Sequence, residues 1–477
     1  MKQRKTVGGW DMGRGMRAVS TAGERPRGRR SRLGPAIAMA VVAALTLAGC
    51  TVSSAPAAPT QSGNDLPKQT ADQLDAAVTG AMKLAGASGA IVGVWAPWAG
   101  SWIASPGTTT LNGSEPMTPA MSFRIGSLTK PMTCAVLLRL VDDGVVKLDD
   151  PVSKYLPRVV GVHAVTLAQL CRNTSGIGDY GPGIVAQFTD NPTRQWAPME
   201  LMSDGLAQPG AGAPAEKWSY SNPGFILLGM ALQAAAGKSW NELYSKYLVE
   251  PLHLSATNLP GGQTLDLPAP APHGYATALD PTTAEPQCGT RLDDTRLSPS
   301  AGWTAGGVVS NLADLKTFAQ EFAAGRPFSD ASARQLWTTT PMADTGSSWQ
   351  SYGMGGVQLG PLRGHDGEVP GFITSMLSDP RSGLTVVVML NNSTSGADFA
   401  QLLGMQLASI AAKAPAVQGK TAPSLSLPWS AAQAATALSS VVQCPPKPAK
   451  ASTPTSTPGP TPTSTPTPAF PVPPPNN

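Results

Sequence analysis

A serine and a lysine stand three residues apart in the segment Ser127-Leu128-Thr129-Lys130. On a helix this spacing places both side chains on one face, so the amine can reach the hydroxyl. A serine hydroxyl alone is a poor nucleophile near neutral pH, because its proton is hard to remove. A lysine held in a dry pocket has a lowered pKa and can help to take that proton. The segment indicates nucleophilic catalysis by Ser127, although the same spacing also occurs by chance in helices.

The segment Tyr220-Ser221-Asn222 supplies a second set of polar groups. The phenol of a tyrosine has a pKa of roughly 10. Beside a lysine cation its phenolate becomes accessible, and it can take the serine proton and return it to a leaving group. Asn222 can donate to a substrate amide and hold the lysine. By itself this pattern is more typical of a turn ahead of a helix that begins at Pro223.

The third segment is His365-Asp366-Gly367, followed by Glu368. If it forms an edge strand beside the serine, the glycine lets the backbone of a substrate approach closely. The N–H groups of Glu368 and Ser127 would then form an oxyanion hole. We expect His365 to add positive charge or a hydrogen-bond donor opposite the acyl group or carboxylate of the substrate.

The three segments in this order, S-x-x-K, Y-x-N and H-x-G, resemble the serine β-lactamase and penicillin-binding superfamily. The chain looks most like D-alanyl-D-alanine carboxypeptidases and class C β-lactamase-like serine hydrolases. The resemblance covers about residues 75–410. Five further segments share it: Phe123–Gly126, Leu148–Pro157, Thr166–Ile177, Trp218–Gly229 and Ala305–Asp314.

The resemblance implies a reaction through an acyl-serine intermediate, with no cofactor. Ser127 attacks the substrate carbonyl, while Lys130 and Tyr220 form the proton-transfer pair. No C-x-x-C or H-E-x-x-H spacing indicates a metal site. The residues expected to contact the substrate are Asn222, His365, Asp366, Gly367 and Glu368.

Asp366 departs from the family pattern. Many relatives carry a threonine or serine at this position, where a hydroxyl can help to bind a substrate carboxylate. An aspartate that points inward repels a carboxylate at a cost of about 1 kcal/mol or more. The substitution weakens the case for D-Ala-D-Ala peptides and penicillins, and it favours a neutral ester or amide.

The order of elements predicts an α+β domain of the β-lactamase/transpeptidase type. Strands come first, a long helical middle follows, and strands return near the end, so both ends of the chain are expected to build one antiparallel sheet beside a helical domain. The expected strands are 90–95, 101–105, 372–377 and 384–390, and the expected helices are 127–141 and 223–236.

The first fifty residues have the pattern of an export signal, with a basic region before the apolar run Gly34–Leu47. Leu47-Ala48-Gly49-Cys50 resembles a lipobox, which predicts lipidation at Cys50; an ordinary cleaved signal peptide is the alternative. We further expect a flexible spacer over 51–70, a hydrolase domain over 71–413, an uncertain extension over 414–444 with a helix at 429–442, and a disordered Pro/Thr/Ser-rich tail over 445–477.

Charge and cysteines constrain the partners. The net charge is +4, and the residues before Cys50 carry ten Lys/Arg and two Asp/Glu, so the remainder is +4 − 8 = −4. A mildly acidic body argues against nucleic acid as a partner. Export permits disulfides. We expect Cys134 to be buried on the helix that carries Lys130, and Cys288 with Cys444 is a candidate pair.

Three functions remain open. The first is an exported, lipid-anchored, D,D-carboxypeptidase-like hydrolase of cell-wall peptides on the outer face of the membrane. The second is an esterase or β-lactamase on the same scaffold, for which Asp366 is the motivation. The third is a wall-binding lipoprotein with a vestigial site, which the intact Ser127, Lys130 and Tyr220 oppose. In the first two cases the partners are a small peptide, ester or β-lactam substrate and the membrane, and we expect a monomer.

Overall fold

The computed structural model describes residues 65–342 and 348–445. The expected signal sequence with Cys50, most of the expected spacer and most of the Pro-rich tail lie outside these residues. Within the described part of the chain, no helix is both long and apolar enough to cross a membrane.

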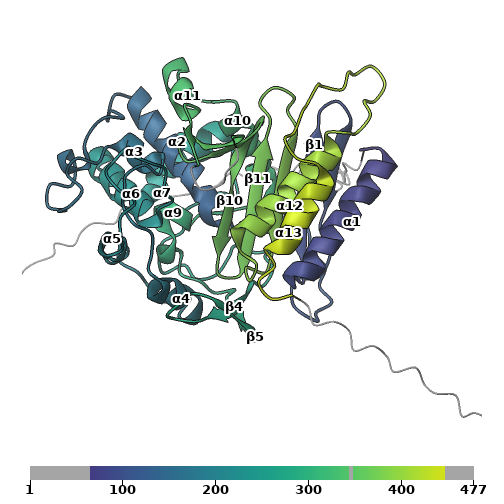
Figure 1. Ribbon diagram of the computed structural model, residues 1–477, viewed down its shortest axis with the longest axis horizontal. Helices are drawn as coiled ribbons and strands as arrows, with labels where there is room; N and C mark the ends of the chain where they lie inside the picture. The colour runs from purple at the N-terminus through teal and green to yellow at the C-terminus, as the bar shows by residue number, and fades with distance from the viewer. Residues whose placement is uncertain (1–64, 343–347, 446–477) are drawn as a thin grey trace, which may run out of the picture. The chain divides into compact units, whose positions relative to one another are not determined.

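An eight-stranded sheet forms the centre of the fold (Figure 1). Its strand order is β2-β1-β12-β11-β10-β9-β8-β7, and all neighbouring strands run antiparallel. β1 pairs with β12, with Ala90 opposite Leu390, which confirms the prediction that both ends of the domain build one sheet. The strands are β1 (Ala90–Ala96), β2 (Gly100–Ala104), β7 (Thr340–Pro341), β8 (Gln350–Tyr352), β9 (Val357–Leu359), β10 (Leu362–Val369), β11 (Phe372–Ser378) and β12 (Thr385–Leu390).

Every residue of β1, β11 and β12 is buried, because helices cover both faces of the sheet. In β1, Ile91 and Trp95 belong to one hydrophobic core, while Val92 and Val94 belong to the other. Successive side chains of a strand point to opposite faces, so each face of β1 contributes to a different core. Two short pairs lie outside this sheet: β3 (Phe123–Arg124) with β6 (Val309–Ser310), and β4 (Tyr275–Leu279) with β5 (Pro286–Asp293).

Three helices from the two ends of the domain, α1, α12 and α13, lie together over one face of the sheet (Figure 1). The helical middle of the chain lies on the other side, where α10 packs against β10, β11 and β12. The helices are α1 (Lys68–Ala85), α2 (Thr129–Asp142), α3 (Leu167–Cys171), α4 (Pro182–Asp190), α5 (Pro198–Ala207), α6 (Asn222–Ala236), α7 (Trp240–Tyr244), α8 (Glu250–Leu252), α9 (Trp303–Gly306), α10 (Leu312–Ala323), α11 (Asp330–Leu336), α12 (Gly396–Ala411) and α13 (Ala431–Ser440).

α2 and α6 are the two long helices that the sequence predicts, and both are confirmed. α2 is preceded by the 3-10 turn η1 (Gly126–Leu128), and nearly all of its side chains are buried. A helix that is apolar on most of its circumference belongs in the interior of a domain. α6 ends at Gly237, whose φ of 61° is the left-handed conformation that glycine adopts without strain.

The folded region extends beyond the expected limits of 71 and 413. α1 begins at Lys68, and Leu66 ahead of it is already buried. At the other end α13 packs on α12, and the indole of Trp429 donates to the carbonyl of Met405 at 2.9 Å. Residues 414–444 therefore belong to the domain, because their apolar side chains complete the core over α12.

The described residues contain two disulfides. Cys288 bonds to Cys444, as predicted, and this bond ties β5 to the segment after α13. Cys134 is buried, as expected, but it also bonds to Cys171 at the end of α3. No local pattern in the sequence predicts the Cys134–Cys171 bond, because the two cysteines lie on different helices that meet only in the complete fold.

Candidate active site

Ser127 lies in the turn η1, which packs directly against β10. Gly126 has a φ of +54°, and a Cβ built on it would lie 2.4 Å from the backbone nitrogen of Glu368. Across the contact, a Cβ on Gly367 would lie 2.2 Å from the carbonyl oxygen of Ile125. Only glycine at both positions allows the two backbones to approach this closely.

The side chains of Lys130 and Tyr220 converge on the hydroxyl of Ser127. Lys130 Nζ lies 2.9 Å from Ser127 Oγ, and the hydroxyl of Tyr220 donates to the same oxygen at 2.7 Å. Lys130 Nζ also donates to Asn222 Oδ1 at 2.7 Å and to the carbonyl of Ala305 at 2.9 Å. Once these two acceptors hold two N–H bonds of a neutral amine, the remaining lone pair faces Ser127. The arrangement suits removal of the serine proton.

The charge state of Lys130 is set by its burial. Its side chain has no exposed surface, and burial lowers the pKa of the amine to about 7, against the opposing pull of Asp179 and Asp366. A substantial fraction of the amine is therefore neutral near pH 7 and can act as a base.

Asp179 is a site residue that the sequence analysis missed. Its carboxylate accepts the backbone N–H of Asn222 at 2.9 Å and the side-chain amide of Asn222 at 3.1 Å. These bonds fix the amide so that its oxygen faces Lys130. Asp179 lies just beyond the family-like segment that ends at Ile177, and no motif marks it, so only the fold reveals its role.

Tyr220 differs from the expectation in its protonation. Burial raises the pKa of its phenol well above the usual 10, and this outweighs the bond to Ser127. The amine of Lys130 lies 4.6 Å from the centre of the tyrosine ring. In the resting site the phenol is thus a proton donor rather than a phenolate base, and Lys130 is the better candidate base.

His365 also differs from the expectation. It is 3% exposed, and burial, together with the charge of Lys130, lowers its pKa to about 3. Its Nδ1 donates to the backbone carbonyl of Asp366 at 2.5 Å, and its Nε2 accepts from the hydroxyl of Tyr352 at 3.1 Å. A neutral ring with both nitrogens occupied presents neither positive charge nor a free donor to a substrate. His365 instead fastens β10 to β8.

The free edge of β10 lines the catalytic cleft. β9 pairs only with residues 362–364 of β10, so no strand in the described part of the chain pairs with the edge beyond Gly364. A Cβ on Gly367 would lie 2.9 Å from the backbone nitrogen of Ser127, and this proximity agrees with the predicted oxyanion hole from the N–H groups of Ser127 and Glu368. The hydroxyl of Thr374 donates to Ile125 at 2.8 Å and holds the serine turn against the sheet.

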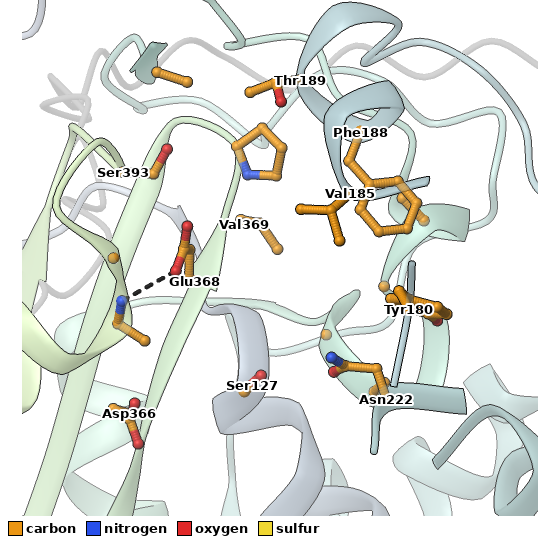
Figure 2. A pocket seen from close by; sticks show the side chains of 18 of the residues that line it. Ser127, Tyr180, Val185, Phe188, Thr189, Asn222, Asp366, Glu368, Val369 and Ser393 are labelled. Carbon is orange, nitrogen blue, oxygen red and sulfur yellow. Dashed lines mark hydrogen bonds between the residues drawn. The ribbon is translucent and has the colours of Figure 1, made fainter. Parts of the chain in front are cut away.

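The cleft is a cavity of about 680 Å³ with Ser127 at its base. Figure 2 shows Asn222 and Tyr180 on one side of Ser127 and Asp366 and Glu368 on the other. In the described residues no group of three or more His, Cys, Asp or Glu side chains is placed to hold a metal ion. The contacts of Ser127 with Lys130 and Tyr220 suit proton transfer and nucleophilic attack at Ser127.

Comparison with known proteins identifies the family of this chain. Residues 74–408 match the family model described as Beta-lactamase. The chain is 27% identical over 292 residues to the D-alanyl-D-alanine-carboxypeptidase/endopeptidase AmpH of Escherichia coli (strain K12), which covers 57% of this chain and 71% of that protein. It is 27% identical over 311 residues to penicillin-binding protein 4 of Amycolatopsis lactamdurans, covering 61% and 77% of the two chains.

A solved structure shows the same fold. The D-stereospecific amidohydrolase from Streptomyces sp. superposes with a TM-score of 0.59 at 27% identity, over 68% of this chain and 94% of the other. The family match spans well over half of the sequence and includes Ser127, Lys130 and Tyr220. The chain belongs to the beta-lactamase family and is a serine hydrolase of the β-lactamase and penicillin-binding superfamily.

Proposed function

We propose that the protein is a D,D-carboxypeptidase-like hydrolase that cleaves short cell-wall peptides through an acyl intermediate on Ser127. The observation that carries the proposal is the shared position of Ser127 Oγ, within hydrogen-bond distance of both Lys130 Nζ and the hydroxyl of Tyr220. One neighbour can accept the serine proton while the other can donate to a leaving group.

The reaction balances with these groups alone. Ser127 Oγ attacks the substrate carbonyl carbon as its proton passes to neutral Lys130, and the N–H groups of Ser127 and Glu368 stabilise the oxyanion. The carbon–nitrogen bond then breaks, and the leaving amine takes the phenol proton of Tyr220. The proton held by Lys130 restores the phenol. A water molecule repeats the sequence in place of the amine, releases the acid and regenerates Ser127.

The peptide substrate is supported by the likeness to AmpH, whose name specifies D-alanyl-D-alanine carboxypeptidase and endopeptidase activity. The test is release of D-alanine from an N-acylated peptide that ends in D-Ala-D-Ala. We expect release by the purified protein, none by Ser127→Ala, and unchanged release by Ser203→Ala, which alters an exposed serine on α5. No release under conditions in which a known carboxypeptidase is active would exclude this substrate class.

A second candidate is an amide, ester or β-lactam hydrolase, and Asp366 is the observation that favours it. Its carboxylate lines the cleft and disfavours a substrate carboxylate. Turnover of short-chain nitrophenyl esters that Ser127→Ala abolishes would support this candidate. The mass of the intact protein after incubation with a penicillin separates the cases further, because a stable adduct on Ser127 indicates a penicillin-binding enzyme, and free hydrolysed penicillin indicates a lactamase.

We also propose that the protein is exported and anchored by a lipid on Cys50, which places the hydrolase on the outer face of the membrane. The pattern that ends in Leu47-Ala48-Gly49-Cys50 supports this location. Metabolic labelling with a fatty acid should mark the wild-type chain and leave Cys50→Ala unlabelled. Equal labelling of the two would rule out Cys50 as the anchor.

A further inference from the structure

The catalytic cleft has an acidic wall and an aromatic wall (Figure 2). Asp366 and Glu368 on β10 and Asp398 on α12 line the first wall. Tyr180 and Phe188 line the other, with their rings edge to face at 5.4 Å. Ser127 lies between them, so a substrate must place one part against carboxylates and another against aromatic rings.

Two of the three carboxylates have a structural explanation. Glu368 Oε2 accepts the backbone N–H of Ala397 at 3.0 Å, in the first turn of α12. Asp398 is exposed in the same turn. Carboxylates at the start of a helix are stabilised by its unpaired N–H groups and its dipole. Both carboxylates therefore have helix N–H groups near them without a ligand, although burial still raises the pKa of Glu368 to about 7.

Asp366 has no such explanation. Among the described residues, the basic side-chain nitrogen nearest to its carboxylate is His365 Nδ1, at 3.5 Å. That nitrogen already donates to a backbone carbonyl. Only 15% of the Asp366 side chain is exposed, so the carboxylate has lost most of its hydration without gaining a cation. Burial accordingly raises its pKa to about 6, although a hydrogen bond from its own backbone N–H and, to a smaller extent, the charge of Lys130 act in the opposite direction.

We propose that Asp366 is a specificity residue that binds a protonated amine of the substrate, while the aromatic wall accepts an apolar side chain of the same molecule. The proposal rests on the second candidate function above, an amide or ester hydrolase that acts through an acyl intermediate on Ser127, and it identifies the substrate class as short peptides, amides or esters with a free amine near the scissile carbonyl. An ammonium group restores the interactions that burial removed from the carboxylate, and a substrate carboxylate in the same place is repelled.

Binding to the Ser127→Ala variant tests the proposal without any chemistry. Calorimetry at pH 7 compares D-phenylalanine amide, whose amine is largely protonated, with N-acetyl-D-phenylalanine amide, which carries no charge. We expect the free amine to bind about tenfold more tightly. Adding Asp366→Asn should remove the difference. Adding Glu285→Gln, an exposed carboxylate at the outer edge of the cleft, should preserve it, because solvent screens that charge.

A second variant covers the possibility that Asp366→Asn folds poorly. Asp366→Thr restores the hydroxyl typical of many relatives, and it should raise the affinity for N-succinyl-D-phenylalanine amide, which carries a carboxylate. Equal binding of the amine and its acetylated form, no measurable binding of the amine at millimolar concentration, or a tenfold ratio that survives both Asp366 variants would each overturn the proposal.

Failure of the proposed function gives a different result. If the binding preference holds in Ser127→Ala but the wild-type protein hydrolyses neither D-phenylalanine nitroanilide nor D-phenylalanine esters, the role of Asp366 stands and the hydrolase assignment for this substrate class falls. If hydrolysis occurs with equal kcat/KM for the free and acetylated substrates, the hydrolase function stands and the role of Asp366 falls.

Discussion

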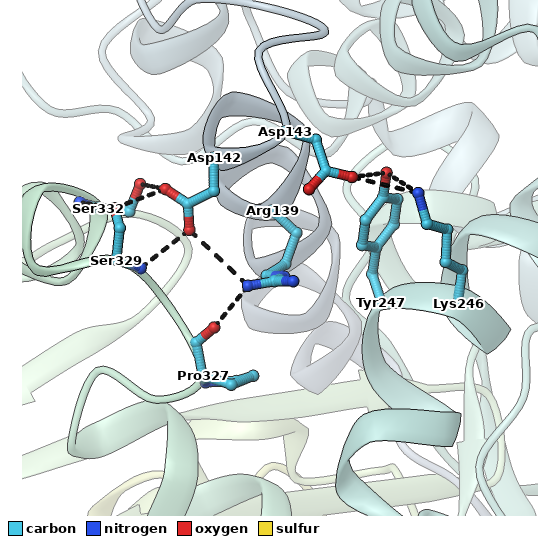
Figure 3. Close-up of polar contacts among 8 residues, drawn as sticks. All are labelled: Arg139, Asp142, Asp143, Lys246, Tyr247, Pro327, Ser329 and Ser332. Carbon is cyan, nitrogen blue, oxygen red and sulfur yellow. Dashed lines mark hydrogen bonds and ion pairs between the residues drawn. The ribbon is translucent and has the colours of Figure 1, made fainter.

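The two ends of α2 differ in the environment of their charged side chains. At the N-terminal end, Lys130 is fully buried, and its pKa is lowered to about 7. At the C-terminal end, Arg139, Asp142 and Asp143 lie near the surface, and each finds polar partners (Figure 3). At the N-terminal end of α2, where we propose the chemistry, burial disfavours the charged form of Lys130. At the C-terminal end, the charged side chains have hydrogen-bond partners on neighbouring elements.

The C-terminal end of α2 is hydrogen-bonded to two other segments of the chain. Asp142 accepts from the backbone N–H of Ser329 at 2.9 Å and from the hydroxyls of Ser329 and Ser332, both at 2.6 Å, at the start of α11. Asp143 accepts from the hydroxyl of Tyr247 at 2.8 Å and from Lys246 at 3.1 Å. We therefore expect substitutions at this end to change stability, and substitutions at the other end to change activity.

The largest expected effect is that of Lys130→Met on catalysis. Loss of a positioned general base lowers kcat/KM by about 10³-fold. The matched control is Lys246→Met, in the segment 245–249 that contacts Asp143 beside the C-terminal end of α2; it removes an amine of the same length and should leave kcat/KM unchanged. Both are checked with the best substrate found for the wild type, after circular dichroism shows a native fold. Equal loss in the two variants would remove the functional distinction between the ends.

The pH dependence of kcat/KM also tests the role of the buried Lys130 at the N-terminal end of α2. A protonated Lys130 cannot accept the serine proton, so kcat/KM should rise tenfold per pH unit at low pH and level off near the pKa of about 7. The charge of Asp366 raises the pKa of Lys130, and therefore Asp366→Asn should move this rise to lower pH. A profile that is flat between pH 5 and 8, or a shift to higher pH in the variant, contradicts the role of Lys130 as the base.

The sequence predicts the active end of α2 well, because Ser127 and Lys130 are close in the chain and a helix fixes their relation. The approach of Tyr220 follows from the family resemblance. Asp179 and the carbonyl of Ala305 could not be predicted, since their roles arise only when distant segments pack around the amine.

The protonation states of the site residues could not be predicted from the sequence either. Burial decides it for His365 and Tyr220, and burial depends on the complete fold rather than on the residues beside them. The strands β1, β2, β11 and β12 were predictable because they alternate or run apolar in short local patterns, whereas the short strands β7, β8 and β9 were not predicted. The Cys134–Cys171 bond was not, because it depends on the packing of α2 against α3.

At the C-terminal end of α2, Asp142→Ala should lower the free energy of unfolding by about 2 kcal/mol, because it leaves partly buried donors of Ser329 and Ser332 without their acceptor. Burial alone would raise the pKa of Asp142, but the bonds from these serines lower it below the usual 3.8. The contribution is therefore present above about pH 4 and is lost as the pH falls through the lower folded-state pKa. Urea unfolding at pH 7 and at a series of pH values below 4 measures both; a penalty that does not shrink as the pH falls below 4 would disagree.

The smallest effect belongs to Asp143→Ala, on the same turn. Its side chain is 35% exposed and its partner Lys246 is 54% exposed, so solvent and salt screen the pair. We expect a loss of about 0.5 kcal/mol in urea unfolding, shrinking further in 0.5 M salt (roughly a 4 Å screening length), with unchanged kcat/KM. Asp142→Ala is the reference, because the two aspartates are adjacent and differ mainly in burial. If Asp143→Ala lowers the free energy of unfolding as much as Asp142→Ala does, the contact with α11 does not account for the stability at this end of α2. The hydrogen bond from Tyr247 to Asp143 then contributes more than we expect.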